Sequence, residues 1–308
     1  MTAERSIVPT GSPPASAHRV AELTPDLLLT EEHQMCPGCG EPLALRVLLD
    51  TLSQLGVAQR TVAVMGIGCY TSFSGTMDLD LVQALHGRAP SVATGVKRML
   101  PDRVVFTMQG DGDMVNEGLQ EVVHTAARGE SVTAVLLNNG VFGETGGHMT
   151  ATSVIGQRTK NTLEGRDAEY HGHPIRIGDL LATLDGSAYV ARGSVHNAGA
   201  VARTKRMVRR AFESQLRGEG FSFVEILTMC PTGWFVPTAE GPGYMDDTLG
   251  QVHTMGELKA RPGGGPSDHA SGALAPEARP GGGPSDHASG ALAPEARPGG
   301  GPEGGVGR

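Results

Sequence analysis

Apolar and polar positions recur along the chain with the periods of helices and of buried strands. Leucines at helical spacing from Leu43 to Leu55 predict a helix, and the nearly continuous apolar run at 103–108 predicts a strand buried on both faces. The same criteria predict further helices at 89–99, 116–128, 177–184 and 197–217, and further strands at 61–65, 132–137, 187–191 and 222–227. Because strands and helices alternate, we expect an α/β fold with a doubly wound, mostly parallel sheet.

The two ends of the chain lack this periodicity. From Ala260 the segment ARPGGGPSDHASGALAPE occurs twice in succession and starts a third time before Arg308. It is rich in Gly, Pro, Ala and Ser and contains no aromatic residue, so it cannot bury enough apolar surface to offset its ordering entropy. We therefore expect a weakly ordered leader at 1–24, one domain at 25–258 and a disordered C-terminal tail at 259–308.

Charge and hydropathy exclude several classes of function. The formal net charge is −8, which does not favour nucleic-acid binding. No apolar run reaches the roughly 18 residues of a membrane helix, and the N-terminus lacks a basic-then-apolar signal. These features predict a cytoplasmic protein, a setting in which four cysteines are more often metal ligands than disulfides.

Polar residues follow two neighbouring predicted strands, as Gly-Asp-Gly at 110–112 and Asn-Asn at 138–139. Ligands of open α/β sheets bind at this edge. Asp111 offers a carboxylate, Asn139 an amide oxygen and Val141 a backbone carbonyl, which are the hard oxygen ligands that Mg²⁺ prefers. The glycines permit close approach of phosphates, and a helix with its N-cap at Asn116 adds a favourable dipole. The pattern predicts a site for magnesium and diphosphate.

The four cysteines form a second candidate site. Cys36 and Cys39 enclose a Pro-Gly turn that can aim both thiolates at one metal, whereas Cys69 and Cys230 each follow a predicted strand. Four thiolates suit either structural zinc or a 4Fe–4S cluster. A redox-active Cys-x-x-Cys disulfide is a third interpretation, which leaves the two distant cysteines unexplained.

The order of these motifs resembles the β subunit of two-component 2-oxoacid:ferredoxin oxidoreductases. The resemblance covers residues 30–258, and it rests on CPGCG at 36–40, GIGC at 66–69, HGR at 86–88, GDGD at 110–113, NN at 138–139, TGG at 145–147 and CPT at 230–232. It implies the thiamine-diphosphate-binding fold, with thiamine diphosphate and Mg²⁺ as cofactors. It also favours a 4Fe–4S cluster on the four cysteines over zinc.

The resemblance further implies the activity, which is CoA-dependent oxidative decarboxylation of a 2-oxoacid with electrons passing through the cluster to ferredoxin. A separate α subunit would complete the active site, because thiamine activation normally needs a glutamate from a different domain, and the sequence shows no second thiamine-binding domain. The loop sequence looks most similar to that of enzymes acting on branched-chain 2-oxoacids, with 2-oxoglutarate as the second candidate substrate. The alternatives are a non-redox thiamine-diphosphate decarboxylase or carboligase with structural zinc, and a non-catalytic zinc-stabilised binding subunit.

The resemblance assigns roles to individual residues. His86 and Arg88 are the candidate catalytic residues, and the chain departs from the family pattern at Glu144 and His148, on either side of the TGG motif. The magnesium ligands expected are Asp111, Asn139 and Val141. The candidate cofactor-binding residues are Gly68, Cys69, His86, Gly110, Asp111, Gly112, Asp113, Asn139, Val141, Thr145, Gly146 and Gly147.

Overall fold

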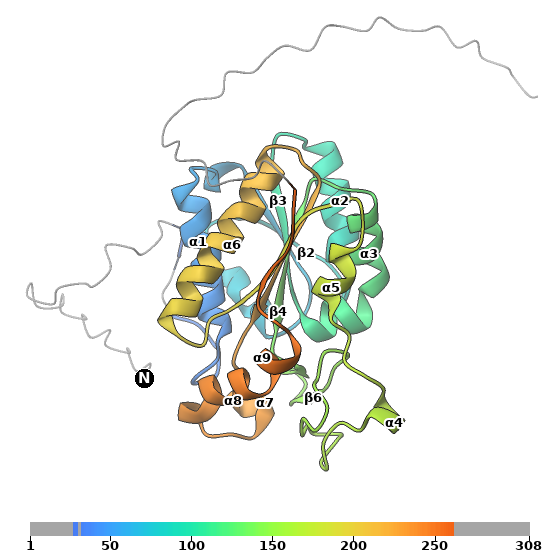
Figure 1. The fold of residues 1–308 in the computed structure, drawn as a ribbon. Helices are drawn as coiled ribbons and strands as arrows, with labels where there is room; N and C mark the ends of the chain where they lie inside the picture. The colour runs from blue at the N-terminus through green and yellow to red at the C-terminus, as the bar shows by residue number, and fades with distance from the viewer. Residues whose placement is uncertain (1–26, 30–31, 262–308) are drawn as a thin grey trace, which may run out of the picture. The chain divides into compact units, whose positions relative to one another are not determined.

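The structure, a computed structural model, describes residues 27–29 and 32–261 (Figure 1). The leader expected at 1–24 and all but the first three residues of the tail expected at 259–308 lie outside these residues. The ordered domain extends slightly past its expected end, because Lys259 and Ala260 complete strand β9 (Gly256–Ala260). Among the described residues, no helix has the length and apolar character needed to cross a membrane.

A seven-stranded sheet forms the centre of the domain, in the order β2-β1-β3-β4-β8-β7-β9. Neighbouring strands are parallel except at one edge, where β9 pairs antiparallel with β7. The other strands are β1 (Thr61–Met65), β2 (Asp80–Gln83), β3 (Val104–Gly110), β4 (Thr133–Asn138), β7 (Ser187–Ser194) and β8 (Phe221–Leu227). The doubly wound, mostly parallel sheet predicted from the sequence is therefore confirmed.

Helices cover both faces of this sheet (Figure 1). One face carries α1 (Glu41–Gln54) and α6 (Ala198–Leu216), which contact each other. The other face carries α2 (Ala89–Met99), α3 (Leu119–Ala127) and α5 (Ile177–Ala182).

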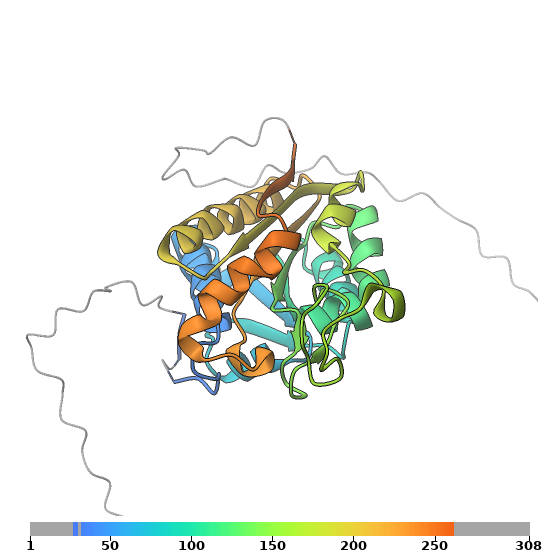
Figure 2. The same ribbon diagram turned by 60° about the horizontal axis from the view of Figure 1, so that its bottom comes forward.

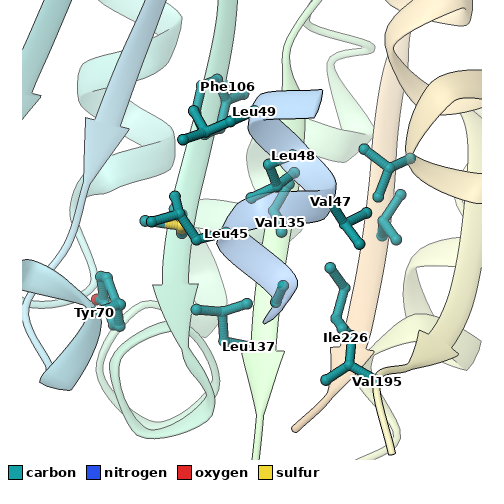
Figure 3. Close-up of a cluster of buried hydrophobic side chains, with 14 of the residues drawn as sticks. Leu45, Val47, Leu48, Leu49, Tyr70, Phe106, Val135, Leu137, Val195 and Ile226 are labelled. Carbon is teal, nitrogen blue, oxygen red and sulfur yellow. The ribbon is translucent and has the colours of Figure 1, made fainter. Parts of the chain in front are cut away.

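The leucines of α1 pack on the central strands of the sheet, because a helix places residues three and four apart on one face (Figure 3). The cluster around them includes Leu45, Leu48, Leu49, Phe106, Val135, Leu137 and Ile226. This packing fixes the start of α1, and with it Glu41, at the carboxyl edge of the sheet.

Short segments gather at this carboxyl edge, which Figure 2 turns towards the viewer. They follow the ends of the parallel strands and include η2 (Cys69–Gly75), β5 (Val141–Phe142), β6 (His148–Met149), α4 (Ala168–His171), α7 (Pro231–Trp234), η4 (Thr238–Glu240), α8 (Gly241–Asp247) and α9 (Leu249–Val252). A short 3₁₀ turn, η1 (Ala58–Arg60), precedes β1.

Several local features differ from the sequence prediction. The edge strands β2 and β9 were not expected, because they are partly exposed and lack the continuous apolar run of a buried strand. The helix expected from Asn116 begins only at Leu119, since residues Gly112–Glu117 form a π-helical turn. Asn116 is therefore not its N-cap, and instead its Oδ1 accepts a hydrogen bond from the backbone N–H of Ala151 at 2.8 Å. Such π-helical turns occur frequently at functional sites.

Candidate active site at the carboxyl edge of the sheet

Asp111 and Asn139 lie in one pocket, because they follow the adjacent parallel strands β3 and β4. The pocket has a volume of about 130 Å³. Val141 and His86 also line it. The structure thus brings together the three residues expected to bind magnesium and one of the two candidate catalytic residues.

The carboxylate of Asp111 is almost completely buried and held by two hydroxyl groups. Its Oδ2 accepts hydrogen bonds from the Oγ1 atoms of Thr150 at 2.5 Å and Thr152 at 2.6 Å. Burial raises the pKa of Asp111 from 3.8 to about 6, although these two hydrogen bonds act in the opposite direction. A bound cation favours the ionised carboxylate, so a metal at this position would offset the cost of its burial.

The side chain of Asn139 is oriented by its neighbours. Its Oδ1 accepts a hydrogen bond from the backbone N–H of Val141 at 3.1 Å, and its Nδ2 lies 3.5 Å from Oε1 of Glu41. Its backbone carbonyl accepts a hydrogen bond from Nε1 of Trp234 at 2.7 Å. The only tryptophan of the chain is therefore in direct contact with a proposed magnesium ligand.

Glu41 is a site residue that the sequence analysis did not identify. Its side chain is 3% exposed, and its Oε2 has no hydrogen-bond partner among the described residues. Burial, followed by the negative charges of Asp111 and Glu144, raises the pKa of Glu41 from 4.5 to about 8. Its position directly after the Cys-Pro-Gly-Cys-Gly motif is the one sequence signal that could have revealed it.

The pocket is strongly acidic. Its lining includes the carboxyl side chains of Glu41, Asp111, Asp113, Glu117 and Glu144, but no lysine or arginine. A diphosphate would be repelled by these charges unless a cation lay between them. The carboxylate of Asp111, the amide of Asn139 and the buried oxygen of Glu41 that lacks a partner therefore fit a site for a divalent metal with diphosphate.

The four cysteines are free thiols; Cys36 is exposed and the other three are partly buried. Gly143 marks the approach of two of them, because a Cβ atom at this glycine would lie 3.2 Å from Sγ of Cys69 and 3.8 Å from Sγ of Cys230. Cys39 is in turn close enough to Cys36 and Cys230 for their charges to raise its pKa. The thiols therefore approach one another beside the pocket, which Cys69 itself lines.

Burial holds the thiols of Cys39, Cys69 and Cys230 in their neutral form in the absence of a metal. Burial is the main cause that raises the pKa values of Cys39 and Cys69 well above the usual range and that of Cys230 to about 12. A metal would reverse this effect, because only thiolates are ligands. Among the described residues, no group of three or more His, Cys, Asp or Glu side chains is arranged to hold a single metal ion. A cluster binds each thiolate through a different iron.

The two side chains of the His-Gly-Arg turn lie in different places, His86 in the pocket and Arg88 at the protein surface. His86 lines the pocket, whereas Arg88 does not, and its half-exposed side chain pairs with Glu121 at 2.9 Å and with the carbonyl of Glu117 at 2.9 Å. The turn itself is held by Asp113, whose Oδ1 accepts a hydrogen bond from the N–H of Gly87 at 2.5 Å. The structure therefore does not bring Arg88 to the proposed reaction site.

The remaining candidate cofactor-binding residues also separate into two groups. Those that line the pocket are Gly68, Cys69, Gly110, Asp113 and Thr145, together with the unexpected Glu144. Asp113 uses its carboxylate to hold the protein, because it also accepts hydrogen bonds from Tyr70 at 2.8 Å and Gln109 at 2.9 Å. Gly112, Gly146 and Gly147 do not line the pocket: Gly112 packs against Phe142, Gly146 faces Lys160, and Gly147 packs against Gly233. His148 also lies outside the lining, 3.3 Å from Oγ1 of Thr145.

Comparison with known proteins identifies the family. Residues 59–226 match the family described as thiamine pyrophosphate enzyme, C-terminal TPP binding domain. The chain is 37% identical over 219 residues to the ketoisovalerate oxidoreductase subunit VorA of Methanothermobacter thermautotrophicus. The aligned region covers 71% of this chain and 46% of that subunit. The chain thus spans about half the length of this relative.

For two further relatives, the aligned region covers a larger share of the relative's own length. The 2-oxoglutarate synthase subunit KorB of Archaeoglobus fulgidus is 33% identical over 197 residues, which is 64% of this chain and 69% of that subunit. A chain of the 2-oxoglutarate:ferredoxin oxidoreductase from Magnetococcus marinus, solved with 2-oxoglutarate, coenzyme A and succinyl-CoA bound, matches with a TM-score of 0.65 and 26% identity, over 77% of this chain and 84% of that one. This chain therefore belongs to the thiamine pyrophosphate enzyme family, among the thiamine-binding subunits of 2-oxoacid:ferredoxin oxidoreductases.

Proposed function

We propose that this chain is the subunit that binds thiamine diphosphate, magnesium and a 4Fe–4S cluster in an enzyme that oxidises a 2-oxoacid. The reaction converts the 2-oxoacid and coenzyme A into an acyl-CoA and CO₂, and it transfers two electrons, one at a time, to ferredoxin. The observation that carries this proposal is that Cys69 lines the same pocket as Asp111 and Asn139. An electron donor and the cluster that accepts its electrons would therefore be neighbours.

Each part of the pocket has a role in this proposal. When bound, thiamine diphosphate supplies the carbon nucleophile and the electron sink for decarboxylation. Asp111, Asn139 and the carbonyl of Val141 would hold Mg²⁺ and, through it, the diphosphate. His86 is the one imidazole in the lining, so it is the candidate to move a proton or to steer an anionic group of the substrate.

The four cysteines would hold the cluster at the side of the pocket formed by Gly143 and Glu144. Because three of these thiols are partly buried, the protein would shield most of the cluster from water. Cys36 is exposed and marks the side from which an electron acceptor can approach. This arrangement supports transfer from the pocket, through the cluster, to ferredoxin at the surface.

The enzyme would act as a complex of at least two kinds of subunit in the cytoplasm. A partner α subunit would supply the glutamate that activates the aminopyrimidine ring of thiamine. The match to a ketoisovalerate oxidoreductase subunit supports a branched-chain 2-oxoacid as the substrate, and the match to 2-oxoglutarate enzymes keeps 2-oxoglutarate as the second candidate.

Reduction of ferredoxin tests this proposal. The chain is co-expressed with a candidate α subunit and assayed without oxygen for ferredoxin reduction by 2-ketoisovalerate or 2-oxoglutarate. We expect reduction that requires the 2-oxoacid, coenzyme A and both subunits. Release of an aldehyde with no ferredoxin reduction would contradict it, because that product is typical of a non-redox decarboxylase.

A further inference from the structure

A fully buried ion pair lies behind the proposed magnesium site. Nε of Arg192 in β7 donates to Oε2 of Glu225 in β8 at 2.7 Å, and both side chains are 0% exposed. The rest of the guanidinium is also occupied, by Asp179 at 2.8 Å and by the carbonyl of Thr254 at 2.9 Å. Because the cost of burying two charges often exceeds their attraction, stability alone is a weak explanation for such a pair.

The ion pair orients the first asparagine of the Asn-Asn motif. Oε1 of Glu225 accepts a hydrogen bond from Nδ2 of Asn138 at 2.8 Å, and Oδ1 of Asn138 accepts one from the N–H of Gly140 at 3.0 Å. With the amide reversed, Nδ2 would face the N–H of Gly140, and Oδ1 would face the carboxylate of Glu225. Glu225 therefore fixes the orientation of the Asn138 side-chain amide, in which Oδ1 points away from the ion pair.

Oδ1 of Asn138 faces the hydroxyl group of Thr152, which holds Asp111. Oγ1 of Thr152 has a single proton to donate, and it lies between two acceptors, Oδ2 of Asp111 at 2.6 Å and Oδ1 of Asn138 at 3.1 Å, so the two oxygens share one hydrogen bond whose shorter arm goes to Asp111. The backbone of Thr152 is held as well, because Nε2 of His253 lies 3.0 Å from its carbonyl oxygen. We call the series Arg192, Glu225, Asn138 and Thr152 the buried relay, and it ends on Asp111.

We propose that the buried relay positions the carboxylate of Asp111 for the metal–diphosphate site, with Asn138, Glu225 and Thr152 as positioning residues. This inference rests on the proposed function of that site. It explains why the motif contains two asparagines: Asn139 faces the pocket, and Asn138 connects the pocket to the ion pair. Residues that orient metal ligands typically contribute about 10–100-fold to metal affinity.

Binding of magnesium and thiamine diphosphate to the full chain tests the relay. The fluorescence of Trp234 reports on the site, because Nε1 of this single tryptophan contacts the carbonyl of Asn139. The chain is titrated with thiamine diphosphate in the presence of excess Mg²⁺, and Mn²⁺ binding is measured separately by electron paramagnetic resonance. Neither measurement requires a partner subunit or turnover.

Two substitutions interrupt the relay at different points, and two serve as controls. Thr152→Val removes the hydroxyl with little change in shape, Asn138→Ala disconnects Glu225, and Thr152→Ser keeps the hydroxyl. Thr204→Val is the matched control, since Thr204 is also fully buried and its hydroxyl makes two 2.8 Å hydrogen bonds, with the N–H and the carbonyl of Ser194.

We expect Thr152→Val and Asn138→Ala to weaken binding of Mn²⁺ and of the magnesium–thiamine-diphosphate pair by about 10–100-fold. Thr152→Ser and Thr204→Val are expected to bind as the parent does. Glu225→Gln should weaken binding in the parent but cause no further loss in the Asn138→Ala background, because Glu225 acts through Asn138.

Three outcomes would overturn the relay. The first is equal affinity in the parent, Thr152→Val and Asn138→Ala. The second is an equal loss in Thr204→Val, which would show a general effect of buried threonines. The third is an additive effect of Glu225→Gln and Asn138→Ala. A parent chain that binds neither thiamine diphosphate nor Mn²⁺ would instead overturn the proposed site, and the relay with it.

Discussion

Replacement of Glu41 by glutamine is expected to prevent most of the loss of stability that the metal-free chain undergoes as the pH rises. In the folded chain, burial and the charges of Asp111 and Glu144 raise the pKa of Glu41 from 4.5 to about 8. The difference between these values, at about 1.4 kcal/mol per pKa unit, corresponds to about 5 kcal/mol. Glutamine has nearly the shape of the protonated acid and no charge to desolvate.

The direction of the effect follows from proton binding. Below pH 4.5 the carboxyl group of Glu41 is protonated in both the folded and the unfolded chain, so its pKa shift does not reduce stability. As the pH rises towards 8, the unfolded chain releases this proton while the folded chain retains it, so the free energy of unfolding falls. Asp111, with its pKa raised to about 6, acts in the same direction over a lower pH range and remains in the variant.

The assay is urea unfolding of the reduced chain in a chelator, followed by circular dichroism between pH 5 and 9. Near pH 5 the parent and Glu41→Gln should differ little, and at pH 8 the variant should be several kcal/mol more stable, up to about 5. Glu117→Gln, the same substitution at an exposed carboxyl group of the pocket, should behave as the parent does. If Glu41→Gln lost stability with pH as steeply as the parent, the burial argument for this carboxyl group would be wrong.

Three further predictions concern the proposed cofactor sites and the role of Arg88. Chelation of divalent metal should abolish thiamine-diphosphate binding, because the pocket lining has no lysine or arginine to attract the diphosphate. Asp111→Ala should weaken this binding at least tenfold in a fluorescence titration. Binding that persists in chelator would contradict this prediction. Gly143→Ala should lower the iron content of the purified chain, since its Cβ would lie 3.2 Å from Sγ of Cys69, while thiamine binding is retained; full iron content would show that the sulfur atoms do not approach this glycine. Arg88→Ala should change the rate of ferredoxin reduction less than about threefold, because Arg88 pairs with Glu121 outside the pocket, whereas a loss of 100-fold, about 2.7 kcal/mol in the barrier, would return it to the catalytic residues.

The central part of the fold could be predicted because its strands are buried on both faces. Runs such as 103–108 are apolar nearly throughout, and strand β3 forms where that run predicts it. The edge strands β2 and β9 were not predicted, for the opposite reason. They are partly exposed and mix polar with apolar residues. Their pairing depends on β1 and β7 rather than on a pattern of their own.

The candidate site could be predicted only in part. Asp111 and Asn139 were found because each follows a buried strand, and the ends of parallel strands meet at one edge. Glu41 and Glu225 were missed, because their roles depend on contacts between distant parts of the chain. The hydrogen bond between Asn138 and Glu225, for example, joins residues 87 positions apart, which no local pattern reveals.

The number and kind of metal atoms in the purified chain test the central claim most directly. The claim is that Cys36, Cys39, Cys69 and Cys230 share one iron–sulfur cluster beside the magnesium and diphosphate site. After purification without oxygen, we predict about four iron and four acid-labile sulfide per chain, and loss of this iron when Cys230 is replaced by alanine. One zinc per chain with no iron or sulfide would contradict the account.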